Sequence, residues 1–160
     1  ASSVVNDDNA LRLLPHVGEP PLRELRTGDL ARLDADGRLV LIGRAKEMII
    51  RGRHNVYPAL HEPVIARLPG VRRCAMVGVW DAAAADERIV LVVEPTDDAP
   101  DAATLAARVA RALRDGPSRI DADALPDHVL VGAIPEAGRS RKPDRAALRR
   151  RAAAAIGLAS

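Results

Sequence analysis

Hydrophobic residues along this chain form short runs separated by polar turns, a pattern typical of a small sheet with helices. Two apolar runs, 30–33 and 39–42, flank the turn sequence Asp34-Ala35-Asp36-Gly37 and predict a β-hairpin. The other predicted strands are residues 48–50, 71–79, 89–93 and 129–131. The predicted helices are residues 59–68, 104–113 and 143–156. In the last helix, Pro143 is expected to occupy the first turn.

These elements follow one another without strict alternation, so the pattern predicts an α+β fold with a small, mostly antiparallel sheet flanked by helices. Residues 1–22 hold several prolines and no sustained period, and we expect a loop there. A polar loop is expected over 81–87. Pro63 lies inside the predicted helix 59–68 and is expected to shorten or kink it.

Composition narrows the class of protein. With 160 residues, the chain is one domain, or one domain and a piece of another. A net charge of +2 gives no reason to expect nucleic acid or an anionic membrane as partner. The single cysteine, Cys74, excludes an internal disulfide and is expected to be buried and inert. No run is long enough for a membrane span and no signal-peptide pattern is present, so a cytoplasmic protein is expected.

Only two of the 24 basic residues are lysines, Lys46 and Lys142. An ammonium is a compact point charge on a flexible stem, whereas a guanidinium is a planar fork, so the two are not interchangeable. Both lysines lie in distinctive segments, Gly43–Ile50 and Ser140–Arg145. We therefore treat both as candidate functional residues.

Several motifs occur in a fixed order along the chain. They are Arg26-Thr27-Gly28-Asp29, Asp34-Ala35-Asp36-Gly37, Gly43–Ile49, Gly52–Pro58, Glu62, Leu68–Val71 and Arg141–Arg145. In this order and spacing they resemble the C-terminal end of the adenylate-forming superfamily, which includes acyl-CoA synthetases, nonribosomal peptide synthetase adenylation domains and firefly luciferase. The resemblance covers about residues 25–148. It implies that 1–45 is the tail of a large N-terminal adenylation domain, with a hinge at about 46, and that 46–160 is the C-terminal lid.

The resemblance also implies roles for residues at the nucleotide and at the hinge. Asp29 matches the aspartate that accepts hydrogen bonds from both ribose hydroxyls of ATP, which suits the two oxygens of a carboxylate. Arg44 matches an arginine near the nucleotide. Lys46 matches the hinge residue, whose backbone torsions change as the lid rotates.

The segment from Gly52 to Tyr57 matches a loop that lines the pantetheine channel during the second half-reaction. Gly52 is expected to let the backbone approach the cofactor closely. Arg53 and His54 depart from the glycine and glutamate that are usual in this loop. The form Asn55-Val56-Tyr57-Pro58 is more similar to acyl-CoA synthetases than to peptide-synthetase domains.

Lys142 matches the catalytic lysine of the first half-reaction. Its ammonium would bridge the substrate carboxylate and the α-phosphate as negative charge develops. Arg141 stands where the family usually has glycine. The basic cluster around this lysine is expected to be a solvated helical face, with contact to CoA phosphates or a carrier protein as the alternative. Its members are Arg139, Arg141, Arg145, Arg149, Arg150 and Arg151.

The implied function is the C-terminal part of an ATP-dependent acid–thiol ligase, as in fatty acid metabolism, which forms an acyl-adenylate and then a thioester. The implied cofactors are ATP, Mg²⁺ held mainly by the large domain, and CoA or the pantetheine of a carrier protein. Its implied partners are its own N-terminal adenylation domain, a carboxylic acid, and CoA or an acyl carrier protein. This chain alone is expected to be inactive.

Alternatives remain open at this level. The adenylate could be loaded onto a carrier protein or used otherwise, or the chain could be a non-catalytic docking module. A nucleic-acid binder is disfavoured because the strands lack stacking aromatics. No metal site is expected, since His54 and His61 lack companion ligands at suitable spacing.

Overall fold

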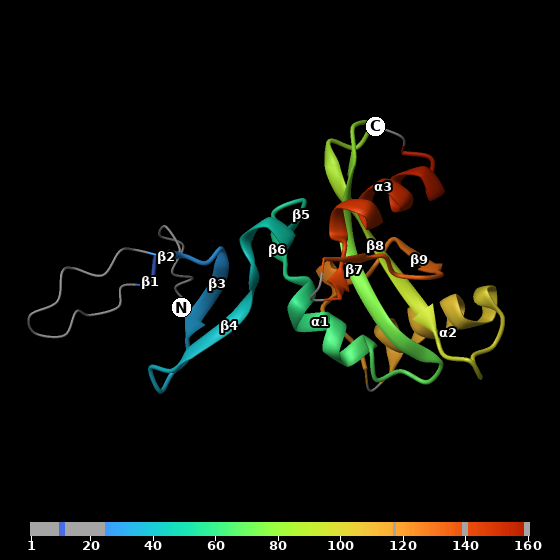
Figure 1. The fold of residues 1–160 in the computed structure, drawn as a ribbon, viewed down its shortest axis with the longest axis horizontal. Helices are drawn as coiled ribbons and strands as arrows, with labels where there is room; N and C mark the ends of the chain where they lie inside the picture. Colours follow the sequence, from blue (N-terminus) through green and yellow to red (C-terminus); the bar gives the residue numbers. More distant parts are fainter. Residues whose placement is uncertain (1–9, 12–24, 117, 139–140, 159–160) are drawn as a thin grey trace, which may run out of the picture. The chain divides into compact units, whose positions relative to one another are not determined.

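The computed structural model describes residues 10–11, 25–116, 118–138 and 141–158 (Figure 1). The chain divides into two compact units, Ala1–Lys46 and Glu47–Ser160. Among the described residues there are three α-helices, two 3-10 turns and several small sheets, mostly antiparallel. This composition confirms the predicted α+β class. None of the helices in this part of the chain has the length and apolar character needed to cross a membrane.

In the first unit, an antiparallel hairpin joins β3 (Asp29–Leu33) to β4 (Leu39–Arg44), as the apolar runs predicted. The Asp34 carboxylate accepts hydrogen bonds from the backbone N–H groups of Asp36 at 2.9 Å and Arg38 at 2.8 Å. These bonds are local to the turn, which explains why the turn sequence was enough to predict the hairpin.

A short strand pair lies partly within the stretch that we predicted as loop. β1 (Ala10–Leu11) pairs antiparallel with β2 (Leu25–Arg26). Strands of two residues are too short for any period to show in the sequence. The rest of the predicted loop 1–22 lies outside the described residues.

The second unit is built around a three-stranded sheet in the order β7–β8–β9 (Figure 1). β7 (Val71–Asp81) and β8 (Asp86–Pro95) are antiparallel, and β9 (His128–Val131) lies parallel to β8. Both long strands exceed their predicted lengths. The expected polar loop is replaced by a tight turn at residues 82–85.

Both faces of this sheet are buried, which accounts for the nearly continuous apolar run along β7. Alternate strand residues pack with α1 (Pro58–Ile65) and α2 (Ala102–Asp115) on one face, and with α3 (Arg145–Ala155) on the other. The first cluster includes Ile65, Met76, Ile89, Leu91 and Leu105. The second includes Val77, Val90, Val92, Leu148 and Ala152.

The first helix is shorter than predicted. α1 ends at Ile65 rather than Leu68, and Pro63 lies within it. Because proline has no backbone N–H, it removes one hydrogen bond from the helix and favours an early end.

The last helix begins later than predicted. The Asp144 carboxylate accepts a hydrogen bond from the Ala147 N–H at 3.0 Å and caps α3, which starts at Arg145. Pro143 therefore lies outside the helix, in β11 (Lys142–Pro143), which pairs with β10 (Glu136–Ala137). Our placement of Pro143 in the first helical turn was wrong, because the aspartate that follows it is the stronger cap.

Further short elements escaped the sequence pattern. The predicted strand 48–50 is present as β5 (Ile49–Arg51), but it pairs with β6 (His54–Val56), where we had expected only a loop after residue 52. Two 3-10 turns, η1 (Ala45–Glu47) and η2 (Ala122–Ala124), were not predicted either.

Candidate functional site

The first unit brings together the two residues that the sequence assigned to the nucleotide. Asp29 and Arg44 are direct partners in the β3–β4 register. The Arg44 Nε atom lies 3.2 Å from Asp29 Oδ1, and both side chains are partly exposed. The hydroxyl of Thr27 accepts a hydrogen bond from the Asp29 N–H at 3.1 Å and so fixes the start of β3. The pair can offer a carboxylate and a guanidinium to the same ligand.

Lys46, the predicted hinge residue, lies in η1 between β4 and β5 and is exposed. It is the last residue of the first compact unit, and Glu47 is the first residue of the second. A 3-10 turn of three residues holds few internal hydrogen bonds, so its torsions can change at small cost.

Gly52 occupies the turn of the β5–β6 hairpin with a φ of +58°. Apart from the glycine and its two neighbours in the chain, no heavy atom of the described residues lies within 4 Å of where a Cβ would stand, so the positive φ is the local reason for glycine here. Its N–H donates to both oxygens of Asp86, at 2.8 and 3.0 Å. That backbone hydrogen bond is the main reason that the pKa of Asp86 is lowered.

Two more carboxylates hold the same hairpin. Glu87 Oε2 accepts a hydrogen bond from the Ile50 N–H at 2.6 Å. Asp127 Oδ1 lies 2.8 Å from Arg51 Nη2, while its Oδ2 accepts from the Ile89 N–H at 2.8 Å. The loop that we expected at the pantetheine channel is thus a hairpin fixed to the start of β8 and to Asp127, which precedes β9.

Lys142 is exposed on β11, opposite Ala137 of β10. The residue before it, Arg141, has a φ of +51°, in the left-handed region that favours glycine. This backbone conformation is one reason that a glycine would suit the position, as the resemblance led us to expect. Ser140 and Arg139 lie outside the described residues.

The β10–β11 hairpin is held by ion pairs around Glu136. Its Oε2 lies 3.0 Å from Arg141 Nε, and its Oε1 lies 2.6 Å from Arg73 Nη1. Bonds to Arg141 first and to Arg73 second lower the pKa of Glu136. The ion pair with Arg141 offsets part of the strain of its positive φ.

The sequence reading missed the role of Arg145, which we had placed on a solvated face. Its side chain is only 14% exposed and forms a forked pair with Glu62, with N–O distances of 2.8 and 2.9 Å. Its Nε lies 3.0 Å from Glu47 Oε2, and its Nη1 also donates to the Met76 carbonyl at 2.9 Å. Burial disfavours the charged form, but the bonds to Glu62 and Glu47 outweigh it and raise the pKa of Arg145.

Glu62 had appeared among the sequence motifs without a role. Besides pairing with Arg145, its Oε1 accepts a hydrogen bond from the Met76 N–H at 2.7 Å. The feature of the sequence that could have pointed to a role for Glu62 is that it is an acidic residue on a predicted helix, next to a proline. Its partner, 83 positions away in sequence, could not be read from it.

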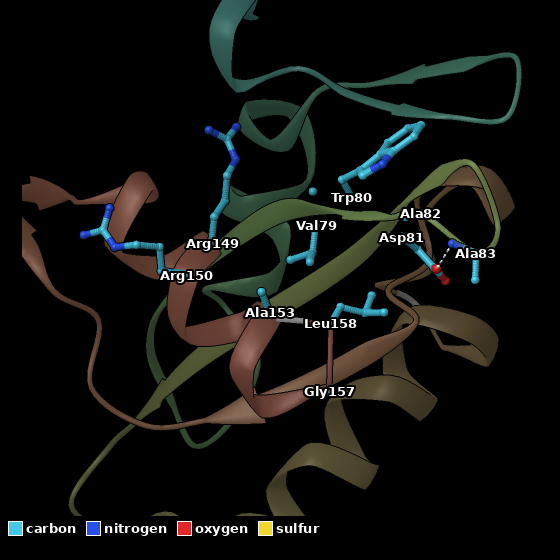
Figure 2. A pocket seen from close by; sticks show the side chains of 11 residues that line it. Val79, Trp80, Asp81, Ala82, Ala83, Arg149, Arg150, Ala153, Gly157 and Leu158 are labelled. Atoms are coloured by element: carbon cyan, nitrogen blue, oxygen red, sulfur yellow. Dashed lines mark hydrogen bonds between the residues drawn. The ribbon is translucent and has the colours of Figure 1, made fainter. Parts of the chain in front are cut away.

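An open pocket of about 400 Å³ lies between the end of β7 and the C-terminal part of α3 (Figure 2). Figure 2 shows that Trp80 and Asp81 come from the end of β7, and that Arg149 and Arg150 come from α3. None of the five predicted site residues lines it.

A smaller pocket of about 270 Å³ contains both histidines of the 54–61 segment. His54 Nδ1 lies 3.3 Å from Asp123 Oδ2. Burial lowers the pKa of His61, against the opposing effect of Asp121. In the described part of the chain, no group of three His, Cys, Asp or Glu side chains is placed to hold a metal ion.

Comparison with known proteins finds that this chain is similar to several CoA ligases. The chain is 34% identical over 130 residues to the medium/long-chain-fatty-acid–CoA ligase FadD8 of Mycobacterium tuberculosis, covering 79% of this chain and 22% of that protein. In sequence and in fold, this chain matches the C-terminal domain of the adenylate-forming enzymes. No family model matches the chain.

Two further comparisons point to the same group of enzymes. The sulfoacetate–CoA ligase of Cupriavidus necator is 48% identical over 69 residues, covering 43% of this chain and 14% of that protein. The crystal structure of ATP-bound MatB from Rhodopseudomonas palustris superposes with a TM-score of 0.65 at 27% identity, covering 83% of this chain and 25% of that one. The chain thus spans only 14–22% of the length of these two curated relatives.

Proposed function

We propose that this chain is the C-terminal part of an ATP-dependent ligase that joins a carboxylic acid to CoA through an acyl-adenylate. The observation that carries the proposal is the match to CoA ligases over most of the chain, with the motif lysine exposed on a hairpin held by ion pairs. The exposed position of Lys142 on the β10–β11 hairpin supports its use as a charge that is fixed in place.

Lys142 is proposed as the catalytic residue of adenylation. The reaction builds negative charge as the carboxylate oxygen attacks the α-phosphorus and pyrophosphate leaves. A fixed ammonium near both groups stabilises that charge without reorganising at the moment of reaction. The β10–β11 pairing and the Glu136 ion pairs supply the rigidity that this role needs.

The Asp29–Arg44 pair is proposed to hold the nucleotide. The carboxylate can accept hydrogen bonds from the two ribose hydroxyls, and the guanidinium can donate to ribose or phosphate oxygens. Their direct register pairing supports a shared ligand.

For the second half-reaction, we propose that Lys46 is the pivot and that the Gly52 hairpin meets the pantetheine arm of CoA. Residues 1–45 would then finish a large adenylation domain, and residues 46–160 would form the lid. Mg²⁺ is proposed to bind mainly on that large domain, and the free thiol of Cys74 is compatible with the reducing cytoplasm. Transfer to a carrier protein is the second candidate acceptor.

The test is ATP–pyrophosphate exchange with the longest protein that the gene encodes, assayed against a panel of carboxylic acids beside the 160-residue chain. We expect exchange by the longer protein with at least one acid, and none by the chain alone. In the longer protein, Lys142→Ala should reduce exchange by about 100-fold or more, because a preorganised charge is lost.

Thioester formation from supplied acyl-adenylate should be spared in Lys142→Ala, and Arg67→Ala, at an exposed arginine outside the basic cluster, is the control that leaves both steps unchanged. Equal loss of both half-reactions in Lys142→Ala would contradict the assigned role. Absence of exchange with every acid would contradict the ligase itself.

A further inference from the structure

One guanidinium in the second unit joins segments that lie far apart in the sequence. Arg145 contacts Glu47 through Nε, Glu62 through both terminal nitrogens, and the Met76 carbonyl through Nη1. We call these four residues the Arg145 junction. Lysine could not replace this arginine, because a single ammonium cannot span acceptors that lie in three directions around a planar fork.

The junction touches both segments whose residues carry the proposed chemistry. Arg145 is the first residue of α3 and lies three positions after Lys142, and Glu47 directly follows Lys46. Glu62 belongs to α1 and Met76 to the middle of β7, so the junction is anchored in the core of the unit.

We propose that Arg145 is a positioning residue. Through its contacts with Glu62 and Met76, it fixes both Glu47, which follows Lys46, and the start of α3, which follows the Lys142 hairpin, to the core of the second unit. This rests on the proposed function, in which Lys46 is the pivot. Because the Glu47 side chain is tied to the second unit, the backbone rotation must take place on its N-terminal side. The pivot is thereby confined to Lys46 and the residues before it.

The chain offers a direct way to measure this tie. Its only lysines are Lys46 and Lys142, and the bond after Lys142 is protected because proline follows. A lysine-specific endoprotease therefore has one susceptible bond, Lys46–Glu47. Its rate of cleavage reports how freely the chain around Glu47 detaches.

We would compare the cleavage rate of the native chain with that of the urea-unfolded chain. The direct effect of a substitution on how well the protease recognises the bond then cancels in the ratio. Glu47→Gln removes the ion pair and leaves the Glu62 fork intact. It should raise the native-to-unfolded ratio of rates by about fivefold, as expected for the loss of one partly buried ion pair. Arg150→Gln, an exposed arginine of the same helix, is the matched control and should leave the ratio unchanged.

A second readout separates positioning from simple stabilisation. In the longest encoded protein, assayed well below its Tm, Glu47→Gln should change the ratio of pyrophosphate exchange to thioester formation. A merely structural residue would lower the Tm and both half-reactions together.

The two readouts also separate this proposal from the ligase proposal. Faster cleavage in Glu47→Gln without any exchange activity would support the tie and overturn the ligase. An unchanged cleavage ratio in an active enzyme would overturn the tie and leave the ligase standing.

Discussion

At the scale of single residues, surroundings decide what each arginine does. Arg141 and Arg145 lie four positions apart in one basic segment. The side chain of Arg141 is 82% exposed and stabilises a turn, whereas that of Arg145 is 14% exposed and joins three segments. A buried guanidinium needs acceptors in several directions, so its loss leaves carboxylates unpaired and is far more costly than the loss of a surface pair.

Cys74 gives a prediction at the same scale. Burial first, and the nearby Glu62 second, raise the pKa of its thiol to about 12. At pH 8, about one thiol in ten thousand would then be ionised, and only the thiolate attacks disulfide reagents. Reaction with an aromatic disulfide reagent should be orders of magnitude slower in the native chain than in urea. Comparable rates in both states would show that the thiol is accessible.

At the scale of elements, the β5–β6 hairpin depends on close contact with β7. A Cβ on Gly78 would lie 2.7 Å from Glu87 Oε1 and 2.8 Å from Ile49 Cγ2. Neither atom can move cheaply, because Ile49 is fully buried and the Glu87 carboxylate is bonded to the Ile50 N–H. The glycine is what lets the hairpin lie against the sheet.

Gly78→Ala should therefore lower the free energy of unfolding by about 1–3 kcal/mol, the usual cost of overpacking. Urea titration of the chain measures this change. Gly132→Ala is a suitable control, since the nearest atom to its added Cβ, an Arg151 nitrogen, lies 3.9 Å away. Equal stability of the two variants would mean that the hairpin can shift without loss.

At the scale of the whole molecule, both hydrophobic clusters lie within the second unit, between Ile49 and Ala153. We therefore predict that residues 47–160 fold on their own and unfold at the same urea midpoint as the 160-residue chain. Fluorescence of Trp80, the single tryptophan, follows the transition. A clearly lower midpoint for the fragment would show that residues 1–46 stabilise the second unit.

The sequence by itself determined the α+β class, the β3–β4 hairpin and most strand and helix positions. It could do so because each of these depends on local chemistry: a turn closed by Asp34, alternation along a strand, or helical spacing of leucines. The motif order also identified Asp29 and Arg44, which the structure then placed side by side.

Tertiary structure alone decided what distant residues do together. The pairing of Arg145 with Glu62 and Glu47 and the anchoring of the Gly52 hairpin by Asp86 and Glu87 join residues separated by 34 to 98 positions. The physical reason is that the two partners of an ion pair do not lie at any regular spacing along the sequence, so no pattern predicts them. A carboxylate accepts from whichever donor the fold brings within reach, and only the packed sheet brings these donors there.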